Sequence, residues 1–221
     1  MRPTSVRRPV LRLWWIALCL LVVPVSGHTA ALIEMRIHGA QVRLVADRAG
    51  ARALLSAGDM RALFDLAGGS VYVSAGGISR RVHARFRPGY ADTPYRVELF
   101  GAGPVLAGFV TRYHVLFIGE QICAELMAAS WMTPFVDPAV RALGILEALQ
   151  PSAADPCGTV PLTTYAAVGW PLIAGKIDHP TLETTKIAFD YQPQGGELVL
   201  PTSFEEGDLQ LLREVAKAAG L

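Results

Sequence analysis

Short runs that alternate apolar and polar residues dominate the chain between Ile33 and Ala128. The clearest are Gln41–Leu44, Met60–Leu66, Tyr95–Leu99 and Arg112–Phe117. A period of two residues puts the apolar side chains on one face of a strand and the polar side chains on the other. Antiparallel sheets accept such two-sided strands, whereas parallel sheets are usually buried on both faces. The pattern therefore predicts an antiparallel sheet with one apolar face that needs a cover.

Glycine-containing turns separate these runs. They lie at Ala57–Asp59, Ala67–Gly69 and Ile118–Glu120. Glycine adopts the positive φ angles that tight hairpins require, so the sequence predicts consecutive hairpins. We expect the Gly-, Arg- and Pro-rich stretch from Ser74 to Thr93 to be a long excursion away from the sheet. Two later runs, Gly169–Lys176 and Thr184–Tyr191, are also predicted to be strands.

Two helices are predicted to supply the cover. The first begins at Asp137, an N-cap residue followed by a proline in the first turn, and ends before Pro151. The apolar residues of this helix are Val140, Leu143, Leu146 and Leu149, while Gly144 weakens it by roughly 1 kcal/mol relative to Ala. The second helix is C-terminal, since Ser203 and Glu206 have the spacing of a capping box. Its apolar stripe is Leu209, Leu212, Val215 and Ala216.

Residues 1–30 have the pattern of an export signal. Four arginines and no acidic residue precede an apolar run from Leu13 to Val25, and the small residues Thr29, Ala30 and Ala31 follow. This order is typical of a secretory signal peptide. The apolar run is shorter than the roughly 20 residues of a membrane-spanning helix. We therefore predict a cleaved signal peptide at 1–30 and one mature domain at 31–221, periplasmic or secreted, with no membrane span.

The export route and the cleavage site stay open. Cleavage after Gly27 also fits, as does cleavage after Ala30 or Ala31. The segment Val6–Arg12 resembles a twin-arginine motif, although the strongly apolar run favours the general secretory route. Ile16–Cys19 has a weak likeness to a lipoprotein box, but Leu18 stands where a small residue is expected.

Composition bounds the class of protein. The chain is 52% hydrophobic, has 18% charged residues and carries a net charge of +1. Removing the four signal arginines from the 20 basic residues, against 19 acidic residues, leaves the mature protein at −3. A mildly acidic chain has no basic field to attract nucleic acid or anionic lipid. Its apolar content is too high for a disordered protein.

Two cysteines, Cys123 and Cys157, remain after signal cleavage. Cysteines in an oxidising compartment usually pair, so we predict a disulfide between them. The alternative is a pair of buried thiols.

Several segments together resemble a known group of proteins. They are Gly103–Phe109, Arg112–Val115, Gly119–Leu126, Gly169–Leu172, Glu183–Thr185 and Leu200–Phe204. These segments resemble an uncharacterised family of exported bacterial proteins, which is similar to the LolA and LppX group of periplasmic lipid and lipoprotein carriers. Leu106 interrupts the family's turn pattern. The resemblance covers most of the mature chain in element order, rests on Gly, Pro and apolar residues, and carries over no functional residue.

The resemblance implies an α+β fold, in which a curved antiparallel sheet forms an unclosed half β-barrel and helices cover its concave face. The alternation independently predicts an apolar face that either fills the core or contacts an apolar ligand. The residues of this face are Val42, Leu44, Phe64, Leu66, Val71, Val97, Leu99, Val115 and Phe117. Trp131 and Trp170 lie near strand ends, where they either line a cavity mouth or pack in the core.

No catalytic or metal-binding motif stands out. Gly101–Gly103 lacks the following helix of a dinucleotide loop. The histidines of the mature chain are dispersed, and no Gly-x-Ser-x-Gly elbow is present. The small basic patch of Arg80, Arg81, Arg85 and Arg87 indicates a solvated loop or a docking surface for an acidic partner. We expect no metal and no cofactor.

Three functions follow from these patterns. The leading hypothesis is an exported, non-enzymatic protein that holds an apolar molecule such as a lipid or an acyl chain. The alternative is a structural or protein-interaction module of the cell envelope with a filled core. A hydrolase whose residues converge only in the fold is the third. A continuous apolar cavity above roughly 300 Å³ favours the first, a filled core favours the second, and a buried histidine beside a carboxylate and a hydroxyl favours the third.

Overall fold

The computed structural model describes residues 29–86, 95–150, 157–158, 160–176 and 178–221. Almost all of the predicted signal peptide lies outside this part of the chain. The strands are β1 (Ala30–Ile37), β2 (Ala40–Asp47), β3 (Arg52–Ala57), β4 (Met60–Asp65), β5 (Ser70–Ala75), β6 (Ile78–His83), β7 (Arg96–Leu106), β8 (Phe109–Ile118), β9 (Gln121–Ala129), β10 (Trp170–Lys176), β11 (His179–Tyr191) and β12 (Glu205–Glu206). The helices are the 3₁₀ helix η2 (Ser130–Met132) and the α-helices α1 (Thr133–Glu147), α2 (Leu162–Ala166) and α3 (Leu209–Ala218).

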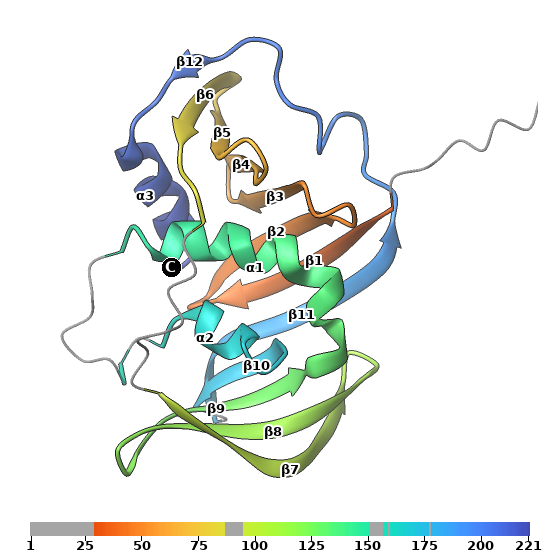
Figure 1. Ribbon diagram of the computed structural model, residues 1–221, viewed down its shortest axis with the longest axis vertical. Coiled ribbons are helices and arrows are strands. Elements are labelled where there is room, and N and C mark those ends of the chain that lie inside the picture. Colours follow the sequence, from red (N-terminus) through yellow and green to blue (C-terminus); the bar gives the residue numbers. More distant parts are fainter. Residues whose placement is uncertain (1–28, 87–94, 151–156, 159, 177) are drawn as a thin grey trace, which may run out of the picture.

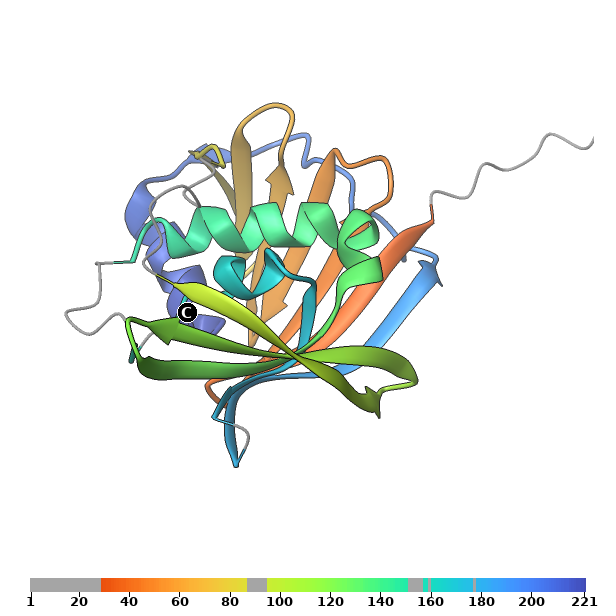
Figure 2. The ribbon, with the colours of Figure 1, turned by 60° about the horizontal axis from the view of Figure 1, so that its bottom comes forward.

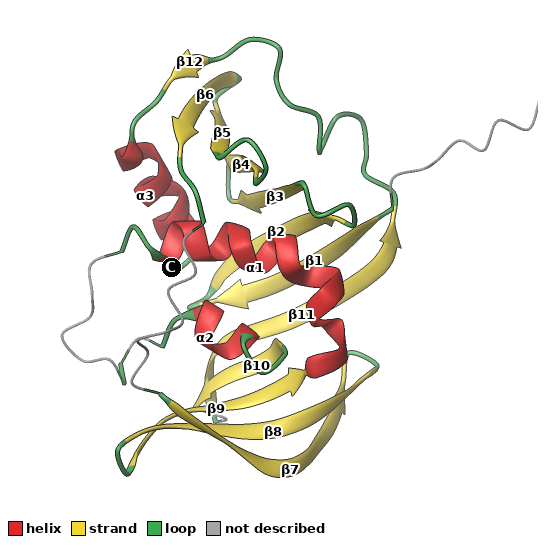
Figure 3. Cartoon of the chain, viewed as in Figure 1, coloured by secondary structure: helices red, strands yellow, loops and turns green. Residues whose placement is uncertain are grey.

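All of these strands belong to one open sheet in the order β12-β6-β5-β4-β3-β2-β1-β11-β10-β9-β8-β7 (Figures 1 and 3). The chain proceeds outward from β1 to β6 by hairpins, then returns from the opposite edge, β7, to β11. There β11 pairs antiparallel with β1. Apart from the short parallel pair of β12 and β6, every pairing is antiparallel. The prediction of an α+β fold built on an antiparallel sheet is confirmed.

The predicted hairpins are present, and one more occurs inside the predicted excursion. β5 and β6 pair between Ser70–Ala75 and Ile78–His83, and Gly76 and Gly77 form the turn with φ angles of 59° and 85°. The prediction that Ser74–Thr93 leaves the sheet is therefore wrong for its first half. The glycines were the signal of a tight turn rather than of a long loop. Residues 87–94 lie outside the described part of the chain.

The helices lie on one face of the sheet, which we call the helix face (Figures 1 and 2). α1 packs on β2 and β3, α2 on β10, and α3 on β4 and β5. Their contact with the strands forms the larger of two apolar cores. The largest fully buried side chains include Phe64, Met132, Leu143 and Trp170.

Both predicted helix starts are wrong by several residues. α1 begins at Thr133 rather than Asp137, because Pro134 already occupies the first turn and Pro138 lies inside the helix. α3 is capped by Asp208, whose Oδ1 accepts a hydrogen bond from the backbone N–H of Leu211 at 3.2 Å. Glu206, predicted to close a capping box, instead belongs to β12.

Gly144 has a packing role in α1. A Cβ atom at this position would lie 2.5 Å from the ring of Phe86. The cost of glycine in a helix is thus offset by the close approach of an aromatic ring.

The opposite face of the sheet is also covered, although the alternation predicted a cover on one face only. Residues 192–204, which we call the strap, run without a helix from the end of β11 to β12 (Figure 1). Leu198 and Leu200 of the strap pack on a second apolar core. The buried members of this core are Ala30, Leu32, Val45, Leu54, Leu63 and Tyr72.

Polar contacts fasten the strap at its first turn. The carboxylate of Glu197 forms an ion pair with Arg43 at 2.7 Å and accepts a hydrogen bond from the hydroxyl of Tyr191 at 2.8 Å. Arg52 donates to the carbonyl oxygen of Leu198 at 2.8 Å. The strap is therefore tied to β2, β3 and β11 at once.

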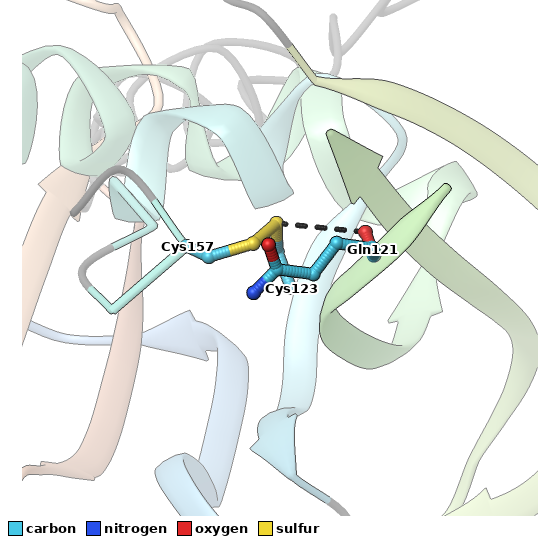
Figure 4. The surroundings of a disulfide bond; sticks show 3 residues. All are labelled: Gln121, Cys123 and Cys157. Atoms are coloured by element: carbon cyan, nitrogen blue, oxygen red, sulfur yellow. Dashed lines mark hydrogen bonds between the residues drawn. A yellow bond between two sulfur atoms is a disulfide. The ribbon is translucent and has the colours of Figure 1, made fainter. Parts of the chain in front are cut away.

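The predicted disulfide between Cys123 and Cys157 is confirmed (Figure 4). It joins the beginning of β9 to the connection between α1 and α2, across a sequence separation of 34 residues. The bond therefore holds one end of the helical layer close to the sheet.

Reduction of this disulfide is expected to lower the free energy of unfolding by about 3–4 kcal/mol, because the open loop gains conformational entropy in the unfolded chain. Urea denaturation with and without dithiothreitol measures the difference. The double variant Cys123→Ser/Cys157→Ser is the control and should not respond to the reductant. An unfolding midpoint of the wild-type protein that is the same with and without reductant would contradict the prediction.

Candidate functional site

The predicted ligand face lies only partly where the alternation placed it. Val42, Leu44, Phe64 and Val71 are buried in the core of the helix face. Leu66 and Val97 are partly buried against the same core. Leu99 lies near the edge of the sheet and is 54% exposed.

Two members of the predicted face, Val115 and Phe117, lie on the other face of the sheet. Leu116 pairs with Val97, so these two side chains share the helix face, whereas Val115 pairs with Glu98 on the opposite face. β8 ends in four consecutive apolar residues, Val115 to Ile118, so alternation alone does not define which face each occupies. The prediction of one common face was wrong for Val115 and Phe117.

The helix face is filled where a ligand cavity was expected. The space between α1, α2 and β10 is lined by side chains such as Leu143, Leu162 and Trp170. The volume that a water molecule could enter there is about 0 Å³. A ligand therefore has no room at this position with the helices placed as they are. Trp170 itself is a core residue whose indole N–H donates to the hydroxyl of Thr184 at 3.1 Å.

A cluster of four aromatic rings lies beside this core at the N-terminal end of α1. We call Phe109, Trp131, Phe135 and Phe189 the aromatic cluster. The ring centroids of its neighbouring pairs are 5.3–6.3 Å apart. Phe109 and Phe189 are partly buried against the core of the helix face. Trp131 is 48% exposed and Phe135 is 39% exposed, so the cluster connects the core to solvent.

Four different elements position these rings. Trp131 lies in η2, Phe135 in the first turn of α1, Phe189 near the end of β11, and Phe109 at the start of β8. Register shifts interrupt the β7–β8 pairing at Leu99/Gly101 and at Ala102/Val105, in the hairpin whose second strand begins with Phe109. Such bulges bend a strand and increase its twist.

A cation adjoins the aromatic cluster. The guanidinium carbon of Arg48, in the turn between β2 and β3, lies 5.7 Å from the centroid of the Phe135 ring. Arg48 is exposed, and no hydrogen bond or ion pair of its side chain occurs among the described residues. The exposed valines Val105 and Val110 lie in the same β7–β8 hairpin as Phe109. The site thus combines exposed rings, aliphatic side chains and one positive charge.

A serine and a histidine lie within reach of each other elsewhere, on β5 and β6. The Oγ of Ser70 is 3.3 Å from Nδ1 of His83. Asp65 pairs with Ser70 on the other side and accepts a hydrogen bond from the backbone N–H of Gly68. In a nucleophilic triad the histidine lies between the acid and the hydroxyl. Here the serine occupies the middle position, so the arrangement differs from that of a triad.

The packing around two titratable groups, His114 and Glu147, shifts their pKa values. Burial lowers the pKa of His114, and the nearby charge of Arg112 lowers it further. Burial raises the pKa of Glu147, although hydrogen bonds from Thr163 and Leu162 oppose this rise. The carboxylate of Glu147 accepts from the backbone N–H of Leu162, and from the backbone N–H and hydroxyl of Thr163 at 3.2 and 2.6 Å. It therefore caps α2 from the end of α1.

No metal-binding group of three or more His, Cys, Asp and Glu side chains is present in the described residues. Within the same residues no helix is long and apolar enough to cross a membrane. The comparisons with known proteins add no relative: no family model, no curated protein and no solved structure matches this chain.

Sequence reasoning identified part of the aromatic cluster. Trp131 was predicted either to line a cavity mouth or to pack in the core, while Phe109 was not a candidate site residue. Phe135 and Phe189 were missed. Phe135 lay outside the helix that was predicted to start at Asp137, and Phe189 lies within the predicted strand Thr184–Tyr191, where no signal set it apart from the other strand residues.

The capping role of Glu147 predicts a stability effect. Glu147→Ala is expected to lower the free energy of unfolding by about 1–3 kcal/mol, because the donors at Leu162 and Thr163 lose their acceptor in a buried place. Glu147→Gln keeps one acceptor oxygen and is expected to lose less. Urea denaturation of the three proteins at neutral pH gives the comparison, and an alanine variant as stable as the wild type would rule out this capping role.

Proposed function

We propose that this protein binds an apolar molecule with an anionic head, such as a fatty acid or an anionic lipid, at the aromatic cluster. The observation that carries the proposal is the exposure of Trp131 and Phe135 next to partly buried rings. Soluble proteins rarely leave contiguous apolar patches exposed unless the patch contacts a partner, a ligand or a membrane. Aromatic rings contribute a large apolar area to such contacts.

Arg48 supports the choice of an anionic head. Its guanidinium lies over one ring of the cluster, so an acyl chain lying on the rings would bring a carboxylate or phosphate into its range. Arginine pairs well with both groups because its planar donors match their oxygens.

The family resemblance points the same way. We propose that the open sheet is the unclosed half β-barrel of the LolA and LppX group, and that its helices cover a concave face. In this reading the aromatic cluster forms an entry to the filled helix face. A chain that penetrates further would have to displace α1, because the space between α1, α2 and β10 holds no water-sized volume.

We also propose that the protein is exported and works in the periplasm or outside the cell, without catalysis. The disulfide supports an oxidising compartment.

The proposal predicts ligand binding that depends on the cluster. Native mass spectrometry of the protein titrated with oleate is expected to give a 1:1 adduct. Trp131→Ser or Phe135→Ser should weaken oleate binding at least tenfold, because each removes an exposed ring from the contact. Arg48→Gln should weaken binding of oleate but not of oleyl alcohol, which lacks the charge.

Phe100→Ser is the matched control. Phe100 is 58% exposed and contacts Tyr113 and Phe117 rather than the aromatic cluster. This variant should bind oleate within twofold of the wild type. No adduct with oleate or phospholipid, or equal losses in Phe100→Ser and Phe135→Ser, would overturn the proposal.

The filled helix face favours a second candidate, an envelope module that docks another protein through the same rings. Its signature is a crosslink between a partner and a photoreactive residue at position 135 in the periplasm, together with failure to bind oleate. The basic side chains Arg80 and Arg81, which were considered as a docking patch, are paired with Glu205 and Glu206.

A further inference from the structure

A small pocket lies under the strap, on the face of the sheet opposite the helices. Its volume is about 170 Å³. The floor comes from β3, β4, β5 and β6, and the roof comes from the strap between Gly195 and Pro201. The aromatic cluster borders the core of the other face, so the two sites are separate.

The floor of the pocket gathers hydrogen-bond donors by strand register. Arg61 on β4 is opposite Ser74 on β5, and Ser74 is opposite Ser79 on β6. The Oγ atoms of Ser74 and Ser79 are 2.9 Å apart. Tyr72 also lines the pocket, so a guanidinium and three hydroxyl-bearing side chains surround one space.

The charge of Arg61 is uncompensated. Its side chain forms no hydrogen bond or ion pair in the described part of the chain, unlike Arg43 and Arg81 of the same face. Glu197 also lines the pocket, but its carboxylate is held by Arg43 and by the hydroxyl of Tyr191. The pocket therefore offers a ligand the unpaired guanidinium of Arg61, beside a carboxylate that is already paired.

Two polar atoms, on residues that pair in register with members of the pocket lining, have no hydrogen-bond partner among the described residues. Ser56 pairs in register with Arg61, and its buried Oγ has no hydrogen-bond partner. Arg81 pairs in register with Tyr72, and its buried Nε also lacks one, while its Nη2 binds Glu206. Buried polar atoms are usually satisfied, so unsatisfied donors around an unpaired arginine call for an explanation.

We propose that the pocket under the strap binds a small oxyanion, with Arg61 as its charged ligand and Ser74, Ser79 and Tyr72 as hydroxyl donors. The volume of the pocket limits the class of ligand that it can hold. Pockets for drug-sized molecules measure about 300–1,000 Å³, so 170 Å³ admits a single phosphate, sulfate or carboxylate group rather than a nucleotide. The glycines in the roof allow close approach, because neither Gly195 nor Gly196 projects a side chain.

The test is isothermal titration of the purified full-length protein with sodium phosphate, sulfate or acetate, at an ionic strength kept constant with sodium chloride. Saturable binding of at least one anion is expected. Arg61→Gln should weaken it at least tenfold, and Ser79→Ala should weaken it about threefold. Binding of phosphate and sulfate without acetate assigns a tetrahedral oxyanion, whereas binding of acetate as well assigns a site that also accepts carboxylates.

Arg213→Gln is the control for net charge, since Arg213 is an exposed arginine on α3 outside the pocket. It should bind within twofold of the wild type, and circular dichroism should show that each variant is folded. The proposal is overturned if none of the three anions binds, or if Arg61→Gln and Arg213→Gln lose the same affinity. Oleate binding at the aromatic cluster should not respond to Arg61→Gln, which separates this result from the proposed function.

Discussion

The architecture depends on the pairing of β1 with β11. β1 begins the described chain and β11 comes about 150 residues later, yet the two strands pair from Ala30–Tyr191 to Ile37–Leu182. This pairing joins two meanders, β1 to β6 and β7 to β11, into one sheet. Contacts at this sequence separation have a large cost in loop-closure entropy, so they form stably only when many form together. Side chains reinforce the pairing, since Arg36 forms an ion pair with Glu183 and Lys186 with Glu34.

The same pairing explains why both faces are covered. β11 ends beside β1, and the chain continues directly into the strap, which crosses the face that carries no helix. Burial alone would raise the pKa of Glu197, but hydrogen bonds from Tyr191 and Arg43 outweigh it and lower the pKa. The carboxylate is therefore held in its charged form at the first turn of the strap. Leu198 and Leu200 follow at once and bury against the second core.

The sequence predicted what depends on local pattern. Alternation and glycine turns located most strands, and two cysteines in a chain with a predicted export signal predicted the disulfide. The sequence did not predict the features that depend on contacts between residues distant in the chain. Ser203 and Glu206 match a capping box in isolation, but Glu206 pairs with Arg81 on β6, so the cap passes to Asp208. The cover on the second face had no local signal, because strap residues 192–204 have no period.

The candidate ligand site was only partly predictable for the same reason. Its four rings come from positions 109, 131, 135 and 189, and no spacing rule connects them. The buried face that alternation did find, with Val42, Leu44 and Phe64, is core. Alternation detects burial, and it does not separate side chains that pack on a helix from those that contact a ligand.

The two edges of the sheet end in different ways, and the hairpin at one of them contributes a ring to the aromatic cluster. At β6 the short strand β12 pairs along the edge and places Glu205 and Glu206 beside two arginines. At β7 no further strand of the described residues pairs, and an open edge invites pairing with other chains. Register shifts and Pro104 interrupt that edge, which reduces the length of regular backbone available for pairing. The same hairpin carries Phe109, whose ring centroid lies 5.6 Å from that of Trp131 and 6.0 Å from that of Phe189, so the strand pair that ends the sheet also contributes a ring to the aromatic cluster.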